Sequence, residues 1–195
     1  MTVHPIEAES YRILEERVDL SPFGPLARAV VSRIVHASAD PEYAGTVVTS
    51  EAELAAGLDA LRSGAPVIAD AEMVRHGIPG VDARCYLGSL GKTAEPPAGL
   101  TRSAAAVRVA AERHRAGAVF VVGCAPTALF ELVRLHAAGE VHPALVIGLP
   151  VGFVGAADAK EALRASGMAA VSNVGEKGGS AVAAAAANAL VRLAC

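Results

Sequence analysis

The sequence predicts an α/β protein with three layers (α/β/α), built around a mainly parallel, Rossmann-like doubly wound sheet with extra N-terminal helices. From residue 66 onward, short apolar runs alternate with helical patterns. This alternation implies right-handed crossovers and parallel strands that are covered by helices on both faces. The run 145–148 is continuously apolar, as expected for a fully covered strand. Aromatic residues make up only 4% of the chain and Trp is absent, so small aliphatic side chains must build the core.

Helices are predicted ahead of the first parallel strand. The segments 5–17 and 22–36 both carry apolar residues at helical spacing. A third helix is expected after Ser50, whose spacing to Glu53 fits a capping box.

The remainder of the chain alternates between the two kinds of element. The predicted strands are 66–69, 84–88, 119–122, 145–148 and 169–172. The predicted helices between or after them are 103–115, 127–138, 158–165 and 179–193. We expect the whole chain, residues 1–195, to form a single domain, because its length suffices for one substantial core.

Polar and glycine-rich residues follow several of these strands. In doubly wound sheets, ligands bind at the carboxyl ends of the strands, near the point where the strand order reverses. The loop 150–155 contains Pro150, Gly152 and Gly155 and leads into a helix that begins near Ala156. Free N–H groups at such a helix start favour an anionic group. We therefore expect a large ligand that carries carboxylates at this edge.

Composition excludes several classes of partner. The net charge of −3 provides no basic stripe for nucleic acid. The three cysteines are odd in number and widely spaced, which fits a reducing cytoplasm rather than a disulfide framework. The first ten residues lack the pattern of a signal peptide, and the apolar segment 181–191 is too short to span a membrane.

His36 is the histidine whose surroundings suggest chemistry. It ends an apolar helix, and Arg33 lies one turn earlier on the same face. A bound carboxylate would favour the protonated imidazole, which suits proton transfer. A helix-terminal histidine that caps backbone carbonyls fits the same spacing, so both interpretations stay open on these grounds. The remaining histidines are expected at the surface: His4, His76, His114, His136 and His142.

Two further segments are candidates for binding anions. Arg102 lies in the first turn of a helix that Thr101 is expected to cap, where an anion would offset its unfavourable position relative to the helix dipole. The segment 177–180 (KGGS) opens the last helix and is typical of a phosphate or carboxylate cradle. Neither a Walker motif, a GxGxxG fingerprint, a nucleophile elbow nor a metal-ligand pair is present, so a nucleotide-dependent enzyme is poorly supported.

Taken together, these blocks resemble the precorrin-8X methylmutase (precorrin isomerase) family of corrin biosynthesis. The resemblance covers nearly the whole chain and follows the family's order of motifs. The matching blocks are RIVHASAD (33–40), DAEMV (70–74), TRSAAA (101–106), APTALFEL (125–132), PVGFVGAA (150–157) with KEAL (160–163), and KGGS (177–180).

The resemblance implies an isomerase that moves a methyl group from C-11 to C-12 of precorrin-8X to give hydrogenobyrinate, or cobyrinate from cobalt-precorrin-8. It implies no cofactor and no catalytic metal, a homodimer, and His36 as the proton-transferring residue. Substrate contacts are expected from Ser10, Arg33, Asp70, Thr101, Arg102, Ser103, Pro126, Thr127, Val151, Gly152, Phe153, Lys177, Gly178, Gly179 and Ser180.

The chain departs from the family pattern at two positions. Cys124 stands where the family usually has Asn, and Glu176 precedes KGGS where arginines are frequent. Glu176 would repel a substrate carboxylate unless it points to solvent. These departures keep an alternative open: a non-catalytic corrinoid-binding or carrier protein.

Overall fold

The structure is a computed structural model that describes residues 4–91 and 95–195. The first three residues of the N-terminal segment therefore lie outside the description. The described residues form a six-stranded sheet with the order β1-β6-β5-β4-β2-β3. Its strands are β1 (Val47–Val48), β2 (Val67–Ala69), β3 (Arg84–Cys85), β4 (Val119–Val122), β5 (Leu145–Gly148) and β6 (Ala170–Asn173).

Every strand pair except one is parallel, which confirms the predicted fold class. β1 pairs antiparallel with β6, Val47 opposite Asn173. From β2 the chain adds β3 on one side and then crosses to β4 on the other. The strand order therefore reverses between β2 and β4, as in flavodoxin-like doubly wound sheets, and this is where a ligand crevice is expected.

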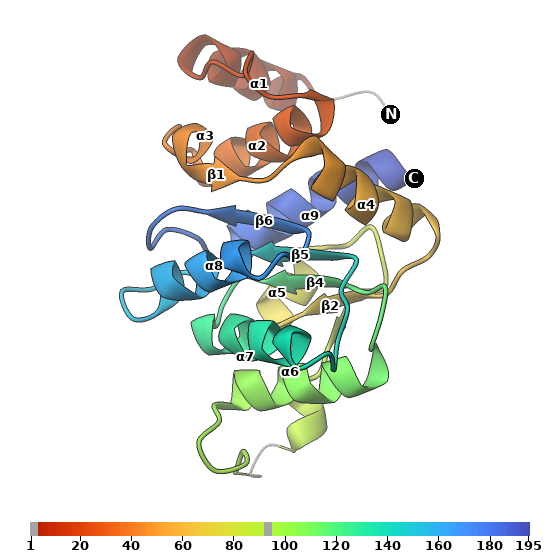
Figure 1. The fold of residues 1–195 in the computed structure, drawn as a ribbon. Helices are drawn as coiled ribbons and strands as arrows, with labels where there is room; N and C mark the ends of the chain where they lie inside the picture. Colours follow the sequence, from red (N-terminus) through yellow and green to blue (C-terminus); the bar gives the residue numbers. More distant parts are fainter. Residues whose placement is uncertain (1–3, 92–94) are drawn as a thin grey trace.

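Helices cover both faces of the sheet (Figure 1). One face carries α4 (Glu51–Arg62), α5 (Glu72–His76) and α9 (Ser180–Ala194), and α2 (Pro25–Ser38) packs on the outer side of α9 and α4. The other carries α6 (Arg102–Arg113), α7 (Pro126–Ala137) and α8 (Ala156–Ala165). The side chains of β4 alternate between the two cores, Val119 and Val121 toward the first and Phe120 and Val122 toward the second. α1 (Pro5–Arg17) packs on the outer side of α2 (Figure 1).

Small residues allow α9 to lie close to the sheet and to α5. A Cβ atom added to Gly123 would lie 2.7 Å from the Cβ of Ala183, and one added to Gly77 would lie 2.7 Å from the Cβ of Ala184. The alanine-rich core expected from the composition therefore provides close helix packing. α9 is 15 residues long, and no helix among the described residues is long and apolar enough to cross a membrane.

Two capping predictions are confirmed. The backbone N–H of Glu53 donates to Ser50 Oγ at 3.2 Å, at the start of α4. The N–H of Ala104 donates to Thr101 Oγ1 at 3.2 Å, at the start of α6.

Some predicted boundaries differ from the structure. α2 begins at Pro25 rather than at residue 22, because extended Gly24 is its N-cap and the carboxylate of Glu51 accepts the N–H of Ala27 at 2.8 Å. The predicted strand 84–88 is β only at Arg84–Cys85, and a 3-10 helix, η1 (Leu87–Leu90), follows. Three short elements were not predicted: α3 (Tyr43–Thr46), β1 and α5.

Candidate active site

The imidazole of His36 is held by α1. Its Nδ1 lies 3.0 Å from Ser10 Oγ. The ring of Tyr11 stacks on the imidazole, with ring centroids 4.7 Å apart and planes within 8° of parallel. Because Ser10 and Tyr11 are adjacent on one helix, a single turn of α1 fixes both the position and the plane of the histidine ring.

Arg33 faces the same helix one turn before His36, as the sequence spacing predicted. Its Nη1 donates to Glu7 Oε1 and to the hydroxyl of Tyr11, each at 2.9 Å. Glu7 and Tyr11 are one turn apart on α1, so they meet Arg33 together. Its guanidinium holds the pKa of the Glu7 carboxyl below its usual range. Tyr11 thus connects Arg33 and His36.

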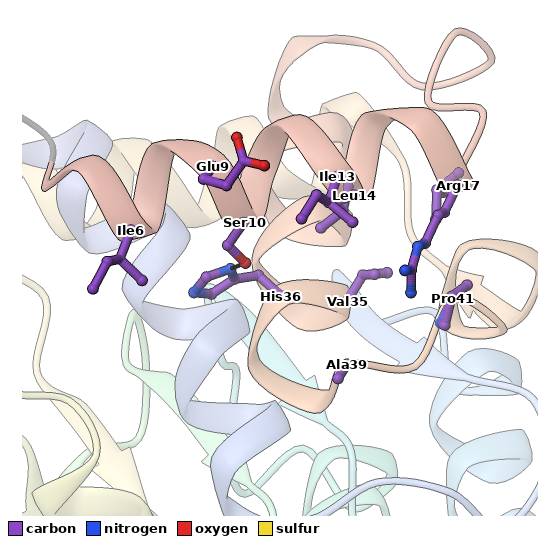
Figure 2. Close-up of a pocket in the computed structure, with 11 residues that line it drawn as sticks. Ile6, Glu9, Ser10, Ile13, Leu14, Arg17, Val35, His36, Ala39 and Pro41 are labelled. Carbon is purple, nitrogen blue, oxygen red and sulfur yellow. Dashed lines mark hydrogen bonds between the residues drawn. The ribbon is translucent and has the colours of Figure 1, made fainter.

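A cavity of about 360 Å³ lies between α1 and the end of α2, and His36 and Ser10 line it (Figure 2). Ligand cavities in proteins typically measure roughly 300–1,000 Å³, so this one can hold part of a large ligand. Among the described residues, the His36 imidazole makes one hydrogen bond, to Ser10 through Nδ1. Nε2 is therefore left for proton exchange. The other walls are Ile6, Glu9, Ile13, Leu14, Arg17, Val18, Val35, Ala39 and Pro41.

Asp70 lies at the point where the strand order reverses. Its carboxylate accepts the backbone N–H groups of Gly123, Cys124 and Ala125 at 3.0, 2.9 and 2.8 Å. Only 4% of the residue is exposed, and this burial raises the pKa of its carboxyl despite the three hydrogen bonds. Asp70 therefore shapes the loop between β4 and α7, and both of its oxygens are engaged with backbone.

Two helix starts meet beside this loop. Thr101 Oγ1 and Thr127 Oγ1, at the starts of α6 and α7, lie 2.7 Å apart. Arg102 donates from Nη2 to the carbonyl of Gly91 at 2.9 Å, and Ser103 and Pro126 lie within the same two first turns. Both helix dipoles present partial positive charge here, which suits a ligand carboxylate.

The loop between β5 and α8 exposes apolar side chains at the same edge. Phe153 is 92% exposed, and Val151 is 49% exposed. The N–H of Gly152 donates to the carbonyl of Glu176 at 3.2 Å, which ties this loop to the one after β6. The side chain of Glu176 is exposed, as expected for a carboxylate that avoids an acidic ligand.

The KGGS segment is fitted closely under the β5–α8 loop. A Cβ atom on Gly178 would lie 2.3 Å from the carbonyl oxygen of Leu149, and the N–H of Gly179 donates to that oxygen at 2.8 Å. Ser180 is the first residue of α9. Backbone without side chains is therefore required at residue 178.

Lys177 joins this edge to the helix that carries His36. Its Nζ lies 2.5 Å from Asp40 Oδ2 and 2.6 Å from Glu42 Oε2, both just beyond the end of α2. The ion pair lowers the pKa of the Asp40 carboxyl and raises the pKa of Lys177. The ammonium group predicted to meet substrate is thus already paired within the protein.

The structure therefore places the predicted site residues in two groups. Ser10, Arg33 and His36 lie between α1 and α2, and the remaining ones lie at the carboxyl edge of the sheet, with Lys177 between the groups. Sequence reasoning missed Tyr11, Asp40 and Glu42. A signal existed for Tyr11, because it lies one helical turn from Glu7; none existed for the acidic partners of Lys177, which are more than a hundred residues away in the chain.

Among residues 4–91 and 95–195, no group of three or more His, Cys, Asp or Glu side chains is arranged to hold a metal ion. The polar groups of the site are instead a hydrogen-bonded histidine, paired cations and helix starts.

This fold, with a histidine held at the wall of a cavity, defines an α/β enzyme. Over residues 5–193 the chain matches the precorrin-8X methylmutase family (CbiC), and it belongs to that family. This places it among the isomerases of corrin biosynthesis.

Similar proteins cover nearly the full length. The cobalt-precorrin-8 methylmutase of Methanothermobacter thermautotrophicus is 43% identical over 194 residues, which span 97% of this chain and 93% of the relative. The precorrin-8X methylmutase of a Sinorhizobium species is 38% identical over 96% of this chain and 93% of its own. The crystal structure of precorrin-8x methyl mutase from Thermus thermophilus superposes with a TM-score of 0.87, at 38% identity and 98% coverage of both chains.

Proposed function

We propose that this protein moves the methyl group of precorrin-8X from C-11 to C-12, giving hydrogenobyrinate, with the cobalt-containing analogue as the alternative substrate. The observation that carries the proposal is the position of His36 at the cavity wall, where Ser10 is hydrogen-bonded to its imidazole and Tyr11 stacks on it. Relatives with both substrate names match this chain, so the metal content of its own substrate is left to the assay below.

In the proposed mechanism, His36 donates a proton to the macrocycle from Nε2. The protonated ring redistributes its electrons, the methyl group undergoes a 1,5-shift, and the proton returns to the imidazole. The C-11–methyl bond breaks as the C-12–methyl bond forms, so no electrons are gained or lost overall. Proton transfer of this kind typically accelerates a reaction by about 10²–10⁴-fold. Ser10 Oγ fixes the ring through Nδ1.

We assign binding and orientation of the substrate to the two groups of residues, one between α1 and α2 and the other at the carboxyl edge of the sheet. Arg33 lies one turn before the histidine, and Lys177 is paired with Asp40 beyond the end of the same helix. The helix starts at Thr101 and Thr127, with Arg102, supply positive potential for the substrate's carboxylates. Val151 and Phe153 are exposed apolar side chains that suit one face of the ring. Gly152, Gly178, Gly179, Ser180, Ser103, Pro126 and Asp70 shape the loops around it.

We further propose that residues 1–195 act as one domain in a homodimer. The exposed Phe153 and the 88% exposed Val154 are costly in water, and a second subunit would cover them. Three free cysteines, at Cys85, Cys124 and Cys195, fit a cytoplasmic location. Sedimentation at micromolar concentration tests the dimer, and a monomer would contradict it.

The function is tested by an anaerobic absorbance assay with metal-free precorrin-8X and with the cobalt form. Catalytic conversion, many equivalents of product per protein, is expected for one of the two. A spectral change that stops at one equivalent would instead identify a corrinoid carrier.

A further inference from the structure

A lysine of α8 lies in the protein interior, and no carboxylate among the residues that the structure describes is hydrogen-bonded to it. Lys160 has 0% of its surface exposed. Its Nζ donates to Asn173 Oδ1 at 3.0 Å and to the backbone carbonyl of Lys177 at 2.6 Å. Both acceptors are neutral, so neither supplies an opposite charge, and burying an ammonium group in this way costs free energy.

The charges around Lys160 affect the stability of its buried ammonium group. Burial and the nearby guanidinium of Arg164 lower its pKa to about 8, while Glu176 acts in the opposite direction. Arg164 itself donates to Ser172 Oγ at 3.2 Å and to the carbonyl of Asn173 at 3.1 Å. An apolar side chain of the same length would avoid the cost of burying a charge. The distinguishing property of lysine at this position is therefore the pair of hydrogen bonds that Nζ donates.

The two acceptors belong to one continuous segment, the last residue of β6 and the loop 174–179 that follows it. Asn173 is also fully buried, and its Nδ2 donates to the same Lys177 carbonyl at 3.0 Å and to that of Val174 at 3.2 Å. The carbonyl of Lys177 thus receives two buried donors, while its ammonium group reaches Asp40 beyond the end of α2. Lys160 holds the backbone of the residue that joins the two halves of the site.

We propose that Lys160 is a positioning residue: by holding the carbonyl of Lys177, it fixes the KGGS loop for substrate binding and keeps the Lys177 ammonium next to the helix that carries His36. Lys160 itself does not reach the substrate. The inference rests on the proposed function for its catalytic meaning, but the loop geometry is testable without turnover.

Hydrogen exchange read by mass spectrometry tests the loop directly. In Lys160→Met, amides of residues 175–180 should exchange at least about tenfold faster, the equivalent of about 1.4 kcal/mol, while β4 and β5 keep their protection. Arg164→Met is the matched control, since it removes a cation that donates to the same strand but not to Lys177. Unchanged exchange at 175–180, or an equal effect in the control, would overturn the proposal. If Lys160→Met does not fold, Lys160→Gln, which keeps a donor but is too short to reach the carbonyl, takes its place.

Steady-state kinetics then test the positioning role. We expect Lys160→Met and Lys177→Met each to raise KM about tenfold with kcat changed less, and the double variant to resemble the single ones because both act through one loop. Fully additive effects, or a loss of thermal stability with KM unchanged, would contradict positioning. If the wild-type protein shows no turnover, the methyl-shift proposal fails, while the exchange experiment still decides the role of Lys160.

Discussion

Ser10 Oγ lies 3.0 Å from Nδ1 of His36, although the two residues are 26 positions apart. This contact determines which imidazole nitrogen remains for chemistry. A hydroxyl at Nδ1 can accept from Nδ1–H in the protonated ring and again in the neutral ring that remains after Nε2 has given up its proton, so it supports the histidine in both states of a proton-transfer cycle. The stacked Tyr11 ring keeps the imidazole from rotating away.

Ser10→Ala should therefore reduce kcat by about tenfold, because the loss of one hydrogen bond to an ionisable group costs roughly 1.5 kcal/mol. Substrate affinity should change little. The measurement is kcat and KM across pH for this variant and for Ser21→Ala, a control on the loop before α2. An unchanged kcat would remove Ser10 from the proton-transfer unit.

Arg102→Ala should weaken substrate binding more than it slows the bound reaction. The guanidinium contributes positive charge at the start of α6, where a substrate carboxylate is expected, and an ionic hydrogen bond is worth roughly 1.5–3 kcal/mol. We expect KM to rise by about 10–100-fold. Arg102→Lys should recover part of the affinity, whereas an unchanged KM in the alanine variant would exclude the carboxylate role.

Gly178→Ala should distort the KGGS loop. The added Cβ atom would lie 2.3 Å from the Leu149 carbonyl oxygen and 2.5 Å from that of Pro150, and overpacking of this kind typically costs about 1–3 kcal/mol. Thermal unfolding and substrate titration should both show the loss. Gly45→Ala is the matched control, because nothing lies within 4 Å of its added atom; equal behaviour of the two variants would contradict the close fit.

The ion pair between Asp40 and Lys177 should stabilise the fold in a pH-dependent way. Lys177 lowers the pKa of Asp40 from its ordinary value of 3.8, so the stabilisation is fully present above that value. It is lost as the pH falls through the lowered pKa of the folded state. The difference in melting temperature between wild type and Asp40→Asn should be present at neutral pH and disappear in strong acid. An equal difference at both pH values would show that the charge of Asp40 is not its source.

The sequence predicted the long elements well and the short ones poorly. The bounds of α1, β4 and β5 agree with the predicted ranges because caps, prolines and continuous apolar runs are local signals. The two-residue β1 has no such signal, since its pairing with β6 depends on residues far along the chain. α5 is likewise too short for helical periodicity to be visible.

The sequence indicated which candidate residues lie together better than it indicated their contacts. Ser10, Arg33 and His36 do lie together, as helical spacing and the family resemblance indicated. The ion pair between Lys177 and Asp40 depends on how distant segments meet in the folded chain, and so does the hydrogen bond from Lys160 to the carbonyl of Lys177. A sequence pattern can identify a lysine as a candidate for binding the substrate. Only the fold shows which protein acceptors are already hydrogen-bonded to it.

The most direct test follows a carbon-13 label placed in the C-11 methyl group of precorrin-8X, using NMR under anaerobic single-turnover conditions. With the wild-type protein, the labelled signal should move to that of a methyl group at C-12. His36→Ala should bind the pigment yet convert it at least about 100-fold more slowly, while His76→Ala, an exposed histidine, should behave as wild type. A label that stays at C-11 in the wild type, or near-normal conversion by His36→Ala, would contradict the account.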